Sequence, residues 1–146
     1  MVKVPINILV VDDEKDFVEM LSLRLKDDGH NLWAAYSGEQ ALSALKTEPI
    51  DVVILDIKMP GMDGISALKE IKNRNPVVEV ILLTGHGAID TAVTGLKSGA
   101  FDYLLKPADY QELLSKLEAA RNRKMEQEER IRKAEAKSLT RKTGGL

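Results

Sequence analysis

The chain has 146 residues, of which 44% are hydrophobic and 30% charged, and its net charge is −2. This composition fits one compact soluble domain, and the near-neutral charge indicates no general affinity for nucleic acid or for a membrane surface. Cysteine is absent, which excludes disulfides and thiolate zinc sites, and no apolar run reaches the ~18 residues that a membrane span requires, so we expect a cytoplasmic protein.

Five short apolar runs alternate with amphipathic stretches of helical period along most of the chain. The predicted strands are 7–11, 31–36, 51–56, 79–84 and 101–105. Helices are predicted over 14–27, 38–47, a stretch marked by Ile65, Leu68 and Ile71, 88–98, and from Asp109 onward. Strict alternation of this kind predicts right-handed crossovers and a parallel sheet that helices cover on both faces.

The C-terminal part differs from the rest in charge. Residues 1–107 carry 11 basic and 16 acidic side chains, whereas residues 108–146 carry 10 and 7. Apolar residues are sparse and irregularly spaced there, so a coiled coil is only weakly indicated. We therefore expect a domain over 1–120 and a charged helical extension or linker over 121–146 that frays at its end. Acids interleave with the basic residues, which argues against nucleic-acid binding.

Polar side chains stand at the carboxyl ends of four predicted strands. Asp12 and Asp13 follow the first strand, Asp56 ends the third, Thr84 ends the fourth and Lys106 follows the fifth. The carboxyl ends of parallel strands meet at one edge of an open sheet, which is where such sheets bind ligands. Clustered carboxylates require a cation, and oxygen ligands favour Mg²⁺. A lysine beside them would add a second positive charge suited to a phosphoryl group.

Asp56 is the best candidate for a nucleophile in this set. It lies on the central strand, and an open Pro-Gly loop follows it. A carboxylate that attacks phosphorus gives an acyl phosphate. Simpler roles exist for each residue alone, since Asp13 or Glu14 could cap the next helix and Lys106 could be a solvated side chain. The convergence of five such residues on one edge favours the chemical role.

Four motifs, in this order, resemble the receiver domain of bacterial two-component response regulators. They are VVDDE (10–14), ILDIKMPGMDG (54–64), LLTGHG (82–87) and FDYLLKP (101–107). The resemblance covers residues 6 to 120 and implies a flavodoxin-like, doubly wound α/β fold with five parallel strands in the order 2-1-3-4-5, five helices and an extended last helix. The segments TGHGAIDTAV and SGAFDYLLKP are most similar to receivers of enhancer-binding (NtrC-type) transcription activators.

The resemblance implies that Asp56 accepts a phosphoryl group from a sensor histidine kinase or a phosphotransfer protein. The reaction would depend on Mg²⁺, held by Asp13, Asp56 and the backbone carbonyl of Lys58, with Asp12 acting mainly through a water. The domain would be a signalling switch rather than an enzyme, and its downstream output would be transcription. Whether the chain is a single-domain regulator or part of a longer one stays open.

The resemblance also implies a conformational switch. Lys106 would pair with the phosphoryl group, Thr84 would move toward it, and Tyr103 would turn inward as Thr84 moves. The Lys106–Pro107 peptide is expected to be cis. The helix over 88–98, the strand over 101–105 and the last helix would form the face of a homodimer.

Two less usual positions flank the acidic cluster. Lys58 follows Asp56 by two residues, and His86 follows Thr84 by two. Side chains here could set the lifetime of an aspartyl phosphate by shielding or admitting water, although a solvated loop histidine is the favoured interpretation of His86. His30, in a turn after a glycine, indicates no functional role.

Two alternatives remain at the level of sequence. Haloacid-dehalogenase-like phosphatases also use a strand-end aspartate with Mg²⁺, but they carry a second acid two residues later, where this chain has Lys58. The second alternative is a receiver-like scaffold that works without phosphorylation.

Overall fold

The computed structural model describes residues 4–59, 61–85 and 89–142, in which five strands alternate with five helices. The strands are β1 (Asn7–Val11), β2 (Asn31–Ala35), β3 (Val52–Asp56), β4 (Glu79–Thr84) and β5 (Asp102–Leu105). The helices are α1 (Lys15–Asp27), α2 (Gly38–Thr47), α3 (Gly64–Arg74), α4 (Ile89–Lys97) and α5 (Tyr110–Lys142). All ten predicted elements are confirmed.

The five strands form one parallel sheet in the order β2-β1-β3-β4-β5. In its register, Ile8 of β1 lies opposite Val52 of β3, and Thr84 of β4 lies opposite Leu105 of β5. Strand β3 occupies the centre and is buried along its whole length. This order confirms the flavodoxin-like, doubly wound fold that the sequence predicts.

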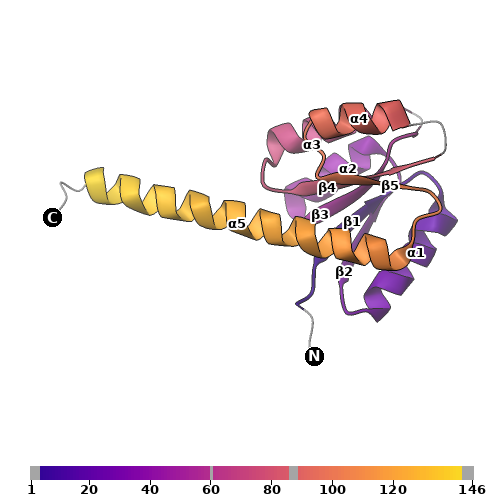
Figure 1. Ribbon diagram of the computed structural model, residues 1–146, viewed down its shortest axis with the longest axis horizontal. Coiled ribbons are helices and arrows are strands. Elements are labelled where there is room, and N and C mark those ends of the chain that lie inside the picture. Colours follow the sequence, from indigo (N-terminus) through magenta and orange to yellow (C-terminus); the bar gives the residue numbers. More distant parts are fainter. Residues whose placement is uncertain (1–3, 60, 86–88, 143–146) are drawn as a thin grey trace.

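Each face of the sheet has its own hydrophobic core. Alternate strand residues point to opposite faces, so Val53 and Leu55 pack with α2, α3 and α4, whereas Ile54 packs with α1 and α5. Figure 1 shows α1 and α5 on one side of the sheet and α3 and α4 on the other. The near-continuous apolar strands follow from this double coverage, because both side-chain sets need an apolar neighbour.

Local signals in the sequence set where the helices begin and end. The carboxylate of Asp63 accepts a hydrogen bond from the Ser66 N–H at 2.8 Å, and that of Asp109 accepts one from the Glu112 N–H at 3.1 Å. Each cap satisfies a backbone donor that the first turn leaves unpaired. After α1, Gly29 has φ of +91°, a conformation that favours glycine.

Helix α5 extends beyond the compact domain. It has 33 residues, or roughly 50 Å at the helical rise, and Figure 1 shows its second half projecting away from the sheet. Leu117 and Ala120 are buried against the core, whereas the side chains of residues 131–140 are all exposed. Contacts with the domain continue past the predicted boundary at residue 120, and that boundary remains a prediction.

Within the described ranges, no helix is both long enough and apolar enough to span a bilayer. The predicted fraying falls on residues 143–146, which lie outside the described residues.

Candidate functional site

The carboxyl edge of the sheet carries a cluster of three carboxylates. One oxygen each from Asp12, Asp13 and Asp56 lies within 4.8 Å of the others. Asp12 directly follows β1 and is fully buried, Asp56 is the last residue of β3 and only 6% exposed, and Asp13 is exposed. The cluster forms because β1 and β3 are neighbours in the sheet and end at the same edge.

In the described part of the chain, Lys106 is the one lysine whose ammonium group pairs with this cluster. Its Nζ donates to Asp12 Oδ2 at 2.7 Å and lies 3.6 Å from Asp56 Oδ1. Its backbone N–H donates to the Thr84 carbonyl at 2.7 Å, which ties the end of β5 to the end of β4. The peptide bond to Pro107 is cis, as predicted.

The electrostatics of the site show an excess of negative charge. Burial, and after it the charge of Asp12, raise the pKa of Asp56 to about 6, although the charge of Lys106 acts to lower it. Burial acts to lower the pKa of Lys106, but its hydrogen bond to Asp12 and the charge of Asp56 outweigh burial and raise it. One ammonium group therefore does not balance three carboxylates, and a further cation would be favoured here.

The donor set suits a hard divalent cation. Carboxylate oxygens are the ligands that Mg²⁺ prefers, and the exposed Asp13 leaves the cluster open on one side. Lys58 donates its backbone N–H to Asp56 Oδ1 at 3.4 Å, and its side chain is exposed. Its carbonyl as a metal ligand stays a prediction.

A backbone group positions Asp12. Asp12 Oδ1 accepts a hydrogen bond from the Glu14 N–H at 3.0 Å. Glu14 is the N-cap residue of α1, but its side chain makes no capping bond. The buried Asp12, rather than Glu14, therefore accepts a hydrogen bond from a backbone donor at the start of the helix. The same carboxylate also pairs with Lys106.

The segment after Asp56 is packed tightly against the start of α3. Gly64 donates its N–H to the Ile57 carbonyl at 2.9 Å. A Cβ at Gly64 would lie 2.5 Å from Ile57 Cα and 2.7 Å from the Asp56 carbonyl oxygen. Because these neighbours are backbone atoms, only glycine fits without moving the phosphoacceptor candidate.

The predicted switch residues lie on the two strands β4 and β5, which end next to Lys106. Thr84 is buried, and its hydroxyl donates to the Gly85 carbonyl at 3.4 Å. Tyr103 is half-buried and packs against the core on the α2, α3 and α4 side. Their motions stay predictions, and His86 lies outside the described residues.

Phe17 is a neighbour of the site that the sequence analysis missed. Its helical spacing indicates only a core position, yet the Lys106 Nζ lies 4.7 Å from the centre of its ring. The signal that could have pointed to it is its place one turn after the aspartate pair, on the face of α1 that points toward the sheet edge.

Comparison with known proteins identifies the family. The family model for the response regulator receiver domain matches residues 8–118. The chain belongs to the response regulator receiver domain family. Receiver domains are signalling domains rather than classical enzymes. The match also favours a receiver over a haloacid-dehalogenase-like phosphatase, the alternative left open by the sequence.

Two curated relatives show where this receiver sits within the family. The transcriptional regulatory protein ZraR of Salmonella typhimurium is 42% identical over 120 residues, covering 82% of this chain and 27% of ZraR. A putative response regulator NtrX-like of Rickettsia bellii is 44% identical over 117 residues, covering 79% of this chain and 24% of that protein. The chain thus spans about a quarter of these relatives, and the predicted resemblance to receivers of NtrC-type regulators is confirmed.

Solved structures agree in fold. The crystal structure of a response regulator receiver domain protein from Clostridium thermocellum has a TM-score of 0.79 and 41% identity, and covers 82% of this chain and 97% of its own. NtrX from Brucella abortus gives a TM-score of 0.80 and 35% identity, over 86% of this chain and 29% of NtrX. The receiver fold therefore accounts for most of the chain.

Proposed function

We propose that this receiver accepts a phosphoryl group on Asp56 from a sensor histidine kinase or a phosphotransfer protein, in a reaction that depends on Mg²⁺. The observation that carries the proposal is the cluster of Asp12, Asp13 and Asp56, with which Lys106 alone pairs among the described lysines. An arrangement so short of positive charge is suited to a divalent cation and a phosphoryl group together.

The transfer uses the Asp56 carboxylate as the nucleophile. One of its oxygens forms a bond to phosphorus while the P–N bond of the phosphohistidine breaks, and the imidazole leaves with the electron pair of that bond. With a pKa of about 6, Asp56 is mostly ionised at pH 7 and can attack. Bound Mg²⁺ would neutralise charge on the phosphoryl group and the carboxylates.

Lys106 and Thr84 would then hold the product. The ammonium group is 2.7 Å from Asp12 and 3.6 Å from Asp56, so a small shift brings it to a phosphoryl oxygen. The Thr84 hydroxyl would be a further donor, and Tyr103 would follow its movement inward. A differential interaction of a few kcal/mol is enough to shift the populations of the two states.

The surface that would read out the switch is formed by α4 and β5. Large apolar side chains are exposed there, namely Ile89, Val93, Leu96 and Leu105. Such a patch on an otherwise charged surface is typical of an interaction site. We propose that α4, β5 and α5 form the contact of a homodimer.

The proposed output is control of transcription by a longer or associated protein. It rests on ZraR, whose name describes a transcriptional regulatory protein. We do not propose nucleic-acid binding by α5, because several of its basic side chains pair with acids, as in Lys124–Glu128 and Arg132–Glu129. A cytoplasmic location is proposed from family membership and from the lack of cysteine.

Intact-mass measurement after incubation with Mg²⁺ and acetyl phosphate tests the proposal. The wild-type chain should gain the mass of one phosphoryl group, which is lost again on standing, and Asp56→Asn should gain none. Leaving out Mg²⁺ or adding a chelator should abolish the gain. Continued release of acetate and phosphate without a bound species would indicate a phosphatase, and no reaction at all would indicate a scaffold.

A further inference from the structure

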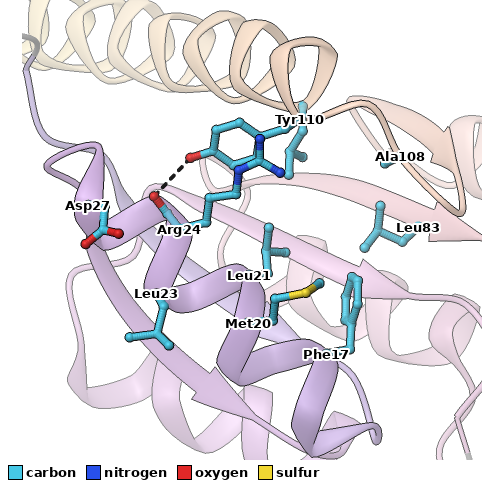
Figure 2. Close-up of a pocket in the computed structure, with 10 residues that line it drawn as sticks. Phe17, Met20, Leu21, Leu23, Arg24, Asp27, Leu83, Ala108 and Tyr110 are labelled. Atoms are coloured by element: carbon cyan, nitrogen blue, oxygen red, sulfur yellow. Dashed lines mark hydrogen bonds between the residues drawn. The ribbon is translucent and has the colours of Figure 1, made fainter.

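A groove of about 400 Å³ runs between α1 and α5 (Figure 2). Its outer rim is apolar, because Met20 and Leu23 are 62% and 64% exposed. At one end, the Arg24 guanidinium lies 3.8 Å from the centre of the Tyr110 ring, and the Tyr110 hydroxyl donates to the Arg24 carbonyl at 3.1 Å. Phe17 lines the other part of the groove.

Phe17 belongs to the groove and to the surroundings of Lys106 at the same time. Its ring packs against the core on the α1 and α5 side, so helix α1 fixes its position. The Lys106 ammonium lies 4.7 Å from the ring centre, 2.7 Å from Asp12 Oδ2 and 3.6 Å from Asp56 Oδ1, so the ring and both carboxylates interact with the same ammonium group. The electron-rich face of an aromatic ring attracts a cation at this distance.

The ring matters most when the lysine changes partners. In the proposed reaction the ammonium shifts from Asp12 toward a phosphoryl oxygen, and a long flexible side chain would otherwise search a larger volume during that shift. A ring that packs against the core and attracts the cation restricts the search. Binding geometry that is held in advance lowers the barrier of a transfer step.

We propose that Phe17 is a positioning residue for Lys106, and that its aromatic face keeps the ammonium group directed at the phosphoryl site. The inference rests on the proposed function, since phosphoryl transfer to Asp56 is the step it serves. It assigns to α1 a role in the chemistry as well as in the packing.

Substitutions at Phe17 separate the ring from its bulk. Phe17→Leu keeps an apolar side chain against the core but removes the ring, whereas Phe17→Tyr keeps the ring. Met20→Ala changes the rim of the same groove without touching Lys106, and serves as the matched control. Thermal unfolding of each variant reports any loss of packing separately from the rate.

The rate of phosphorylation by phosphoramidate, with Mg²⁺ present, is the measurement. This small donor carries a P–N bond and needs no docking surface. Phe17→Leu should lower the maximal rate about threefold to tenfold. Phe17→Tyr and Met20→Ala should stay within about twofold of wild type. When Lys106→Ala is already present, Phe17→Leu should cause no further loss, because the group it positions is gone.

A second readout does not depend on phosphorylation. The ε-methylene protons of Lys106 should show an upfield ring-current shift by NMR in wild type and in Phe17→Tyr, and lose it in Phe17→Leu. Equal rate losses in both Lys106 backgrounds, or unchanged methylene shifts in Phe17→Leu, would overturn the inference. If the wild-type chain is phosphorylated and Phe17→Leu reacts at the same rate, only the role of Phe17 is refuted. If the wild-type chain never gains a phosphoryl group, the proposed function is refuted as well.

Discussion

The acids at the two edges of the sheet differ in how their negative charge is balanced. At the amino edge, the Asp51 carboxylate accepts from the Lys124 ammonium at 3.0 Å and from the Asn7 N–H at 2.9 Å. Glu79 is paired with Lys72 at 3.0 Å and with Arg123 at 3.7 Å. Each acid there has its cation within the chain.

At the carboxyl edge, three acids meet one lysine in the described part of the chain. The consequence is visible in Asp56, whose pKa is raised to about 6, mainly by burial and then by Asp12. Both edges use strand-end acids of the same kind, so residue type does not separate them. What separates them is whether the folded chain supplies the opposing charge, and an acidic cluster left short of it indicates a site for an external cation.

The most severe way to disturb the carboxyl edge is to add one methyl group at Gly64. In Gly64→Ala the Cβ would lie within 2.7 Å of backbone atoms of Asp56 and Ile57. We expect a loss of about 4 kcal/mol in the free energy of unfolding, together with slower phosphorylation, because the segment after Asp56 must move. Urea unfolding measures the first effect. Gly85→Ala is the control, since among the described residues other than its chain neighbours no atom lies within 4 Å of its added Cβ.

Neutralising Asp56 should stabilise the protein when no metal is present. Because folding raises this pKa from 3.8 to about 6, the protonated form is favoured in the folded state, and stability is lost as pH rises through that interval. The advantage of Asp56→Asn over wild type should therefore be absent below pH 4 and grow to roughly 3 kcal/mol above pH 6. Chemical unfolding in a chelator at several pH values tests this, and a constant difference across the range would contradict it.

Neutralising an acid at the amino edge should lower the stability of the fold, which is the opposite of the effect expected for Asp56→Asn. Asp51→Asn removes the ion pair with Lys124 and weakens the bond from the Asn7 N–H, so we expect a loss of about 1 to 2 kcal/mol. Burial acts to lower the pKa of Lys124, but its hydrogen bond to Asp51 and the charges of Asp51 and Glu128 outweigh burial and raise it, so the ammonium stays charged at pH 7 and its contribution is lost as pH rises through that raised pKa. A gain in stability in Asp51→Asn would contradict the difference in charge balance between the two edges.

The smallest effect on stability is expected from a substitution in the projecting part of α5. Glu129 pairs with Arg132 within the helix, and both side chains are exposed. Exposed pairs of this kind contribute little. Glu129→Gln should leave the unfolding midpoint of the domain unchanged, in contrast to Asp51→Asn, and a clear shift of that midpoint would show that the extension is coupled to the domain.

The fold could be predicted because its signals are local. Continuous apolar runs mark strands covered on both faces, and the carboxyl ends of such strands meet at one edge whatever the loops do. Asp12, Asp56 and Lys106 were found from that rule alone, and the structure brings their charged groups together.

The contacts that the sequence did not indicate are those set by tertiary packing. The stacking of Lys106 on Phe17 and the pairing of Lys124 with Asp51 depend on the angles at which α1 and α5 cross the sheet. His30 is a further case. It follows a turn glycine and suggests nothing in the sequence, yet it is buried, and its Nδ1 accepts the Ile6 N–H at 3.1 Å.

Calorimetric titration with Mg²⁺ tests the difference between the edges most directly. Wild type should bind one ion. Asp13→Asn should weaken binding at least about tenfold, because an exposed ligand is lost while the fold is kept. Asp51→Asn, at the other edge, should bind as wild type does. A wild-type chain that takes up no Mg²⁺, or an Asp51→Asn variant that loses as much affinity as Asp13→Asn, would contradict the assignment of the carboxyl edge as the cation and phosphoryl site.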